Sequence, residues 1–403
     1  GKPRHHIVFG TFGRKDDHRL GREAVSMSDA MFLWGVFRYA PLLETVLGGD
    51  CEMQPAALEG YAVHFPLAGS DPQLIRQPDG VTDGVLIAGM PPAMRVRLWY
   101  FLEGLGGSSV EAEVSLLPGG GRVLATVWMP PHLPSQDEVG ALWDIDAWIA
   151  QWGDIWVEAA HEAMDALSHG GQSLVGRWEM MKQRGATRVR AGQVDRPSLR
   201  ADFAATKDVE VITPRRPYTE YFTLTDHDLR FRRFDGSMSP MVRRAGFVGG
   251  DAATVLPYDP VSDSVLVVEQ FRAGPLMRGD PHPWTLEPIA GRIDPGELPE
   301  DAIHREALEE AGLEIGELFA IGNYYPSPGA VTEFVYSYIG LADLAGRGGE
   351  IGGVDHEDED IRTHVLSFER LMELITAGEV NTGPLILSAY WLAQNRAGLR
   401  PSG

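Results

Sequence analysis

Residues 291–313 read GRIDPGELPEDAIHREALEEAGL, and this stretch decides how the second half of the chain is expected to fold. Residues 299–311 have the composition of a helix that begins at a proline. On this helix Glu306 and Glu310 lie four residues apart and share a face with Glu309. Like charges at this spacing repel each other, and a divalent cation bound among the carboxylates would remove the repulsion. We therefore predict a cation site on the helix.

The loop before the helix favours the same interpretation. Two glycines and Pro295 in residues 291–296 allow a tight turn, which can present the carbonyl of Ala290 to the cation. REALEEAG alone is also typical of a solvated, glutamate-rich helix. The whole spacing, Gly-x5-Glu-x7-Arg-Glu-Ala-Leu-Glu-Glu-Ala-Gly-Leu, is far more specific. It resembles the signature of the Nudix hydrolases, with Ala307 where that family usually has an aliphatic residue.

The resemblance covers roughly residues 213–396 and is strongest to the ADP-ribose pyrophosphatase branch. It is carried by SPMVRRAGF, VVEQFRAGP, WTLEPIAGRID, YYPSPGAVTEFVY and HEDEDIRTHV. It implies an α/β/α sandwich within a chain of mixed α/β class. It also implies hydrolysis of ADP-ribose to AMP and ribose 5-phosphate with Mg²⁺, or with Mn²⁺ in its place. Two alternatives stay open: a pyrophosphatase for another nucleoside diphosphate sugar, and a regulatory module that binds ADP-ribose without cutting it.

The resemblance also assigns roles to acidic residues. Glu306, Glu309, Glu310 and the carbonyl of Ala290 would hold the metal. The chemistry then needs a carboxylate base to take a proton from water. Aligned on the motif EDI, Glu357 in the acidic loop 355–360 would be that base, with Glu359 two residues further on. Arg305 would orient the glutamates through charge-assisted hydrogen bonds.

The substrate-binding residues follow from the same motifs. Arg272 in EQFR would grip the diphosphate, and Glu333, four residues after SPG, would contact the part of ADP-ribose beyond it. Tyr221 would stack on adenine, Glu287 would contact substrate, and Arg244 would reach the substrate across a dimer interface. A homodimer through the Nudix domain is therefore implied.

The bulk properties limit the classes of function. The chain has 403 residues and a formal charge of −22, which is unlike a general nucleic-acid binder. No apolar run approaches the roughly 20 residues of a membrane helix. Cys51 is the only cysteine, so the sequence predicts a cytoplasmic protein without disulfides or a thiolate zinc site.

Composition divides the chain into segments. Residues 1–26 are basic, precede the first recognisable pattern, and are predicted to be a leader or an added extension. We expect one domain over 27–190, a linker over 191–212, and the Nudix domain over 213–403. The block 135–190 carries tryptophans at helical spacing, which is typical of a buried helix face.

Residues 31–129 resemble the γ-glutamylcyclotransferase-like fold, a small β-barrel. The family motif Tyr-Gly-Thr-Leu-Arg reads Trp-Gly-Val-Phe-Arg here, so Gly35 and Arg38 are kept while the tyrosine and threonine are replaced. Glu103, followed by glycine, matches the family's acid/base. Two interpretations stay open, an active cyclotransferase and a binding or scaffolding barrel, and the altered loop favours the second. The fusion of the two domains resembles the TrgB-type tellurite-resistance proteins.

Overall fold

The structure is a computed structural model, and it describes residues 29–168, 170, 173–193, 199–200, 202–353 and 359–400. The predicted leader 1–26 and Glu357 lie outside these residues. In the described part of the chain, no helix is long and apolar enough to cross a membrane.

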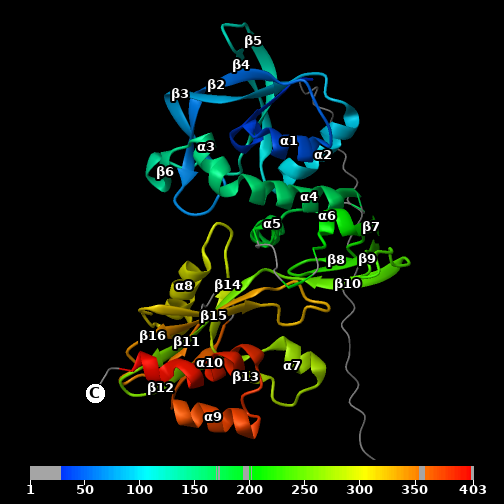
Figure 1. The fold of residues 1–403 in the computed structure, drawn as a ribbon. Helices are drawn as coiled ribbons and strands as arrows, with labels where there is room; N and C mark the ends of the chain where they lie inside the picture. Colours follow the sequence, from blue (N-terminus) through cyan, green and yellow to red (C-terminus); the bar gives the residue numbers. More distant parts are fainter. Residues whose placement is uncertain are drawn as a thin grey trace, which may run out of the picture.

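The N-terminal half contains a closed five-stranded β-barrel (Figure 1). Its strands run in the order β3-β1-β5-β4-β2, and pairing between β2 and β3 closes the ring. A short sixth strand, β6, pairs with β2. The fold is consistent with the expected cyclotransferase-like barrel. The strands are β1 (Met31–Trp34), β2 (Gln54–Pro66), β3 (Gln73–Ile87), β4 (Ser108–Leu116), β5 (Arg122–Met129) and β6 (Val139–Leu142).

Two glycines shape the barrel strands. Strand β1 ends at Trp34, because Gly35 has a positive φ of 63° and starts a 3-10 turn. Strands β2 and β3 are the longest of the barrel. Their pairing continues on both sides of an irregularity at Gly60, where the register shifts.

Helices cover one side of the barrel. They are α1 (Ala40–Leu47), α2 (Pro92–Gly104), α3 (Ile145–Trp148), α4 (Asp154–Ser168) and α5 (Trp178–Gly192), with a π-helical turn at Ile149–Gly153 between α3 and α4. Trp148, Trp152, Trp156 and Trp178 are buried, as the helical spacing predicted, whereas Trp143 precedes α3 and is half-buried. Trp156 is 1% exposed, and its ring meets those of Trp148 and Trp178 edge-on at 5.6 and 5.0 Å.

Replacing Trp156 with alanine should lower the free energy of unfolding by about 3–5 kcal/mol, because a large buried ring leaves a cavity. The Trp156 Nε1 also donates to the Ser70 hydroxyl at 3.1 Å, and that bond would be lost. Denaturant unfolding followed by circular dichroism measures the change. Trp284→Ala is the control, since Trp284 is 58% exposed. Equal stability of the two variants would contradict the packing argument.

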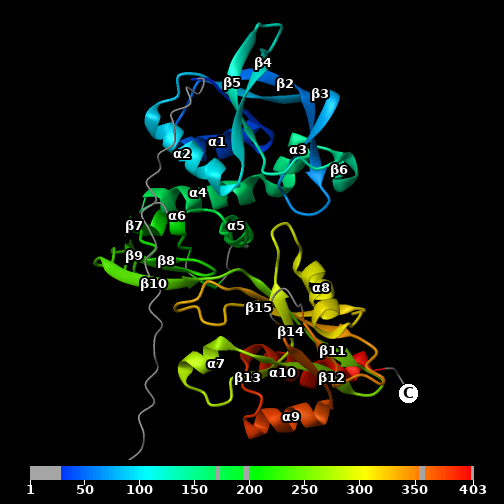
Figure 2. The same ribbon diagram turned by 180° about the vertical axis from the view of Figure 1, so that it is seen from behind.

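The segment 191–212, whose composition predicted a linker, contains regular structure. Helix α5 continues to Gly192, and α6 (Ala205–Asp208) leads into β7 (Val209–Thr213). Strand β7 pairs with β9 (Thr223–Phe231), which also pairs with β8 (Tyr218–Thr219) and β10 (Val242–Val248). Strand β7 is exposed along its whole length, with sequence VEVIT. This small sheet lies beside α5, between the barrel and the rest of the molecule (Figures 1 and 2).

The C-terminal half is an α/β/α sandwich around a mixed sheet. The order β15-β16-β11-β12-β18-β17 includes a parallel pair, β11 with β16, and β13 and β14 add to β12 and β11. The strands are β11 (Ala252–Asp259), β12 (Ser264–Phe271), β13 (Trp284–Glu287), β14 (Ile289–Arg292), β15 (Leu318–Tyr324), β16 (Val335–Leu341), β17 (Ile351–Gly352) and β18 (Ile361–Ser367).

Both faces of this sheet are buried. Along β12, Leu266 and Val268 join the core under α8 (Pro299–Ala311), while Val265 and Val267 join the core under α9 (Phe368–Ala377) and α10 (Gly383–Leu399). This alternation of period two places apolar side chains on both faces of the strand. A short helix, α7 (Ala273–Arg278), follows β12. The helix expected over 299–311 is confirmed at both ends.

Candidate active site

The acidic helix α8 lies against β14, and a glycine makes the close approach possible. A Cβ atom at Gly291 would overlap the carboxylate of Glu306. The predicted tight loop follows, with Gly296 at φ 80°. The space beside Gly296 is filled from the other half of the chain, because a Cβ there would lie 2.6 Å from the ring of Trp152. The glycines of the motif thus serve close packing on both sides of the loop.

Arg305 binds the acidic groups around it. It donates to both carboxylate oxygens of Glu297 at 3.0 Å, to Glu306 at 2.6 Å and to Glu309 at 3.2 Å. It also donates to the carbonyl of Arg292 at 2.9 Å. Arg305 thus joins three glutamates, and its orienting role stays a prediction.

Glu310 is the most buried of the glutamates on this helix. It is 2% exposed, and its Oε2 has no hydrogen-bond partner, while the backbone N–H of Ala290 donates to the carboxylate. Burial raises the pKa of Glu310 well above its usual range, and the carboxylates of Glu306 and Glu359 add to the effect. Burial likewise raises the pKa of Glu306 to about 7, although Arg305 opposes it.

This donor set fits a divalent cation. A buried carboxylate oxygen without a partner, next to a second carboxylate, is the environment that a hard cation stabilises. Within the residues that the structure describes, no group of three or more His, Cys, Asp or Glu side chains is gathered closely enough to hold a metal ion. Glu306 and Glu310 would supply two carboxylate ligands. The carbonyl of Ala290 and the carboxylate of Glu309 remain predicted ligands.

The end of β17, just before the undescribed residues, lies next to α8. The N–H of Gly353 donates to the carbonyl of Glu309 at 3.2 Å, and a Cβ at Gly352 would overlap the backbone of Glu310. Beyond the undescribed residues 354–358, Glu359 lies close enough to raise the pKa of Glu306 and Glu310. Sequence reasoning named Glu359 only as a neighbour of Glu357, and the charge run gave no further signal.

Two of the predicted substrate-binding residues bind each other. Arg272 donates in a bidentate arrangement to Glu287, at 2.9 Å from Nε and 2.7 Å from Nη2. Thr285 donates to the same carboxylate at 2.5 Å. Arg272 also feels the charges of Glu310 and Glu359, so it faces the acidic cluster. Glu287 thus has an observed role in holding Arg272.

Glu333 and Tyr221 are linked through an arginine that the sequence analysis missed. Burial raises the pKa of Glu333, and the charges of Arg292 and Arg272 oppose this shift. The Arg292 guanidinium also lies 4.3 Å from the centre of the Tyr221 ring. Arg292 stands inside the signature as an ordinary variable residue, so no pattern singled it out.

Arg244 lies apart from this group. It is exposed on β10, and its Nη1 donates to the carbonyl of Arg243 at 2.9 Å. The structure contains one chain, so the predicted contact across a dimer interface stays a prediction.

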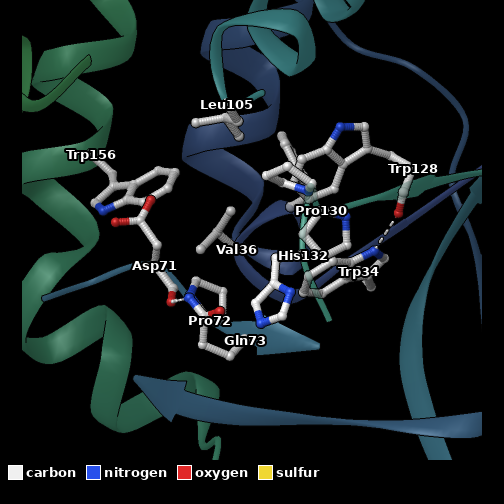
Figure 3. Close-up of a pocket in the computed structure, with 12 residues that line it drawn as sticks. Trp34, Val36, Asp71, Pro72, Gln73, Leu105, Trp128, Pro130, His132 and Trp156 are labelled. Carbon is white, nitrogen blue, oxygen red and sulfur yellow. Dashed lines mark hydrogen bonds between the residues drawn. The ribbon is translucent and has the colours of Figure 1, made fainter. Parts of the chain in front are cut away.

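The candidate residues of the barrel domain are not all brought together. Val36 and Phe37, next to Gly35, line a cavity of about 230 Å³ with the indoles of Trp34, Trp128 and Trp156 (Figure 3). Glu103 lines a separate, more open depression. Arg38 is exposed and does not line the first cavity. The loop and the predicted acid/base therefore do not share one pocket.

Known proteins match the C-terminal half. The NUDIX domain family matches residues 250–386. The ADP-ribose pyrophosphatase of Haemophilus influenzae is 35% identical over 198 residues, which are 49% of this chain and 91% of the relative. The Escherichia coli K12 protein of the same name is 37% identical over 193 residues, 48% of this chain and 91% of the relative.

A third relative carries a different substrate in its name. The GDP-mannose pyrophosphatase of Enterobacter sp. (strain 638) is 34% identical over 184 residues, 46% of this chain and 94% of the relative. All three relatives are covered almost throughout by the half of this chain that contains the acidic helix. The chain therefore belongs, through its C-terminal half, to the Nudix family of hydrolases.

Proposed function

We propose that the protein hydrolyses the pyrophosphate bond of ADP-ribose to AMP and ribose 5-phosphate, with Mg²⁺ or Mn²⁺ as the metal. The observation that carries the proposal is the buried, unpartnered Oε2 of Glu310 next to Glu306, on a helix that Arg272 faces. The similarity to two ADP-ribose pyrophosphatases supports the choice of substrate.

The residues of the site would act as follows. Glu306 and Glu310, with Glu309 and the carbonyl of Ala290, would hold the metal. A bound divalent cation polarises the phosphoryl group and acidifies water. Arg272, held by Glu287, would bind the diphosphate as a fixed bidentate donor.

The remaining roles rest on the resemblance. Glu357 would take the proton from the attacking water, with Glu359 beside the same carboxylates. Tyr221 and Glu333 would contact the nucleoside and the distal ribose. Arg244 would complete the pocket of a second subunit in a homodimer. A cytoplasmic location follows from the single cysteine, and a part in tellurite resistance follows only from the fusion.

AMP release from ADP-ribose tests the proposal. With Mg²⁺, the full chain should produce equal amounts of AMP and ribose 5-phosphate, and EDTA should abolish the reaction. Excess Mg²⁺ should restore it. Binding of ADP-ribose without AMP release would instead favour a regulatory module. The buried glutamates argue against that alternative. Burying a carboxylate costs free energy because the group loses its contact with water, and a protein that only binds ADP-ribose does not need such groups.

GDP-mannose should be tested as a second substrate, because one of the relatives is named a GDP-mannose pyrophosphatase. The ratio of kcat/KM for the two substrates decides between them. A ratio in favour of GDP-mannose would keep the chemistry and overturn the assigned substrate.

We infer that the barrel domain is a binding or scaffolding module rather than an active cyclotransferase. Glu103 lies away from the cavity beside Gly35, and the motif around Gly35 is altered. The expected division of the chain into 27–190, 191–212 and 213–403 is retained as a proposal, although α5 and β7 reach into the middle segment.

A further inference from the structure

A second cavity, of about 540 Å³, lies where α4 and α5 meet the small sheet and the segment 325–332. Its volume is in the range of small-molecule binding sites. Its walls come from both halves of the chain: Arg184 and Arg188 from α5, Thr223 and His227 from β9, and Pro328 from the segment that precedes Glu333. It is separate from the acidic cluster on α8.

Three polar groups that line this cavity have an atom without a hydrogen-bond partner. They are the Oγ1 of Thr223, the Nη1 of Arg188 and the Nδ1 of His227. Thr223 is 1% exposed, so bulk water does not readily satisfy its hydroxyl. Buried polar groups are normally paired, so three unpaired ones along a single cavity are available to a polar ligand that enters it.

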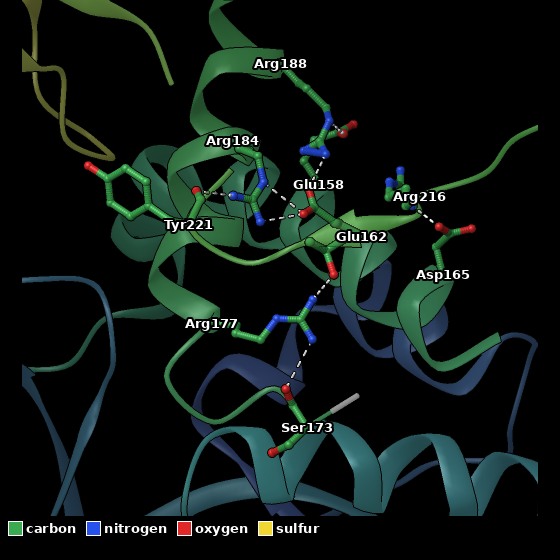
Figure 4. Close-up of polar contacts among 10 residues, drawn as sticks. Glu158, Glu162, Asp165, Ser173, Arg177, Arg184, Arg188, Arg216 and Tyr221 are labelled. Carbon is green, nitrogen blue, oxygen red and sulfur yellow. Dashed lines mark hydrogen bonds and ion pairs between the residues drawn. The ribbon is translucent and has the colours of Figure 1, made fainter. Parts of the chain in front are cut away.

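The charges around the cavity favour an anion as that partner. One carboxylate, Glu162, is 1% exposed and accepts bonds from two guanidinium groups (Figure 4). Arg184 donates to it at 2.9 and 2.7 Å, and Arg188 donates through Nη2. The other nearby acid, Glu158, is 3.8 Å from the Nε of Arg188 and 39% exposed. Arg188 is therefore only partly neutralised.

Other charged groups do not reverse this balance. Arg216, which also lines the cavity, is paired with Asp165. Burial lowers the pKa of His227, and the charge of Arg216 adds to the effect, so the imidazole is neutral. A neutral imidazole has one nitrogen that donates a hydrogen bond.

We propose that this cavity binds a phosphate monoester. The unpartnered groups of Thr223, Arg188 and His227 can each donate to an oxygen of a phosphate, which carries about −1.5 to −2 charges at neutral pH. Pro328 and Val331 give the cavity an apolar wall for the body of the ligand. The site goes beyond the proposed hydrolysis, and it would stand even if ADP-ribose were not the substrate.

Isothermal titration of the full chain in EDTA tests the site. The ligands are AMP, ribose 5-phosphate and inorganic phosphate. The one that binds most tightly identifies the group that is attached to the phosphate. Arg188→Met should raise Kd at least tenfold, and Thr223→Val should raise it several-fold. Arg230→Met is the matched control for Arg188→Met. Arg230 lies on β9, the strand that carries Thr223, but it is 47% exposed and does not line the cavity.

Arg188→Met could misfold, since Arg188 also pairs with buried Glu162. Thr223→Val is the second variant because it leaves that ion pair in place. Valine has nearly the shape of threonine and removes only the unpartnered hydroxyl. We expect the melting temperature of the ligand-free variant to equal or exceed that of the wild type, while the ligand-induced shift is lost. Wild-type affinity in Thr223→Val, or no saturable binding of any of the three phosphates to the wild type, would overturn the proposal.

Discussion

Glu310→Gln should lower kcat for ADP-ribose by about 10³-fold, because the carboxylate that would hold the metal loses its charge. The change should affect KM far less, since Arg272 and the nucleoside contacts are untouched. Steady-state kinetics at saturating Mg²⁺ measure both constants. Mn²⁺ binding followed by electron paramagnetic resonance should weaken in parallel, which ties the loss of activity to the metal.

The same substitution should raise the melting temperature of the metal-free protein. Burial raises the pKa of Glu310, so a charged carboxylate at neutral pH destabilises the folded state relative to the unfolded one. A neutral amide removes that penalty. Opposite changes in stability and activity exclude misfolding as the cause. Glu314→Gln, at an exposed glutamate just beyond α8, is the control and should change neither quantity. Normal kcat in Glu310→Gln would remove Glu310 from the catalytic machinery.

Gly291→Ala should lower kcat by about 10²-fold, because the added Cβ would occupy the position of the Glu306 carboxylate. Either Glu306 moves or α8 shifts away from β14, and both misplace a carboxylate of the metal site. The measurement is kcat for ADP-ribose together with the concentration of Mg²⁺ at half-maximal activity, which should rise.

Gly398→Ala is the control for that variant. A Cβ at Gly398 meets nothing within 4 Å, and the residue lies in α10 on the other side of the large sheet. Its activity should equal that of the wild type. If Gly291→Ala also keeps full activity with an unchanged Mg²⁺ requirement, the close approach of Gly291 to Glu306 does not position the site.

Much of the C-terminal fold could be predicted because its sequence patterns are local. Helix α8 is bounded by Pro299 and by Gly312, whose φ is 54°, and both signals are visible in the sequence. The spacing of Glu306 and Glu310 likewise fixes their common face. The burial of Glu310 was not predictable, because it depends on β14 and β17, which are close only in the folded chain.

The prediction was weaker where function depends on contacts between distant segments. The pairing of Arg272 with Glu287 joins β13 to the residue after β12 and leaves no signature in the sequence. The composition around the predicted linker 191–212 was misleading, since several of the charged residues there form ion pairs with distant segments, such as Arg190 with Asp251 and Asp208 with Arg232. In the barrel, the resemblance suggested that Glu103 and Gly35 share a site, but the fold places Glu103 in another depression.

The contact of Trp152 with the backbone at Gly296 makes the two halves of the chain mechanically dependent on each other. The loop that leads into the acidic helix has no room for a side chain at Gly296, because the Trp152 indole occupies that space. Grafting the C-terminal half of this chain onto a foreign partner would leave that shape without its complement. The helical segment that carries Trp152 therefore forms one wall of the loop that leads into α8.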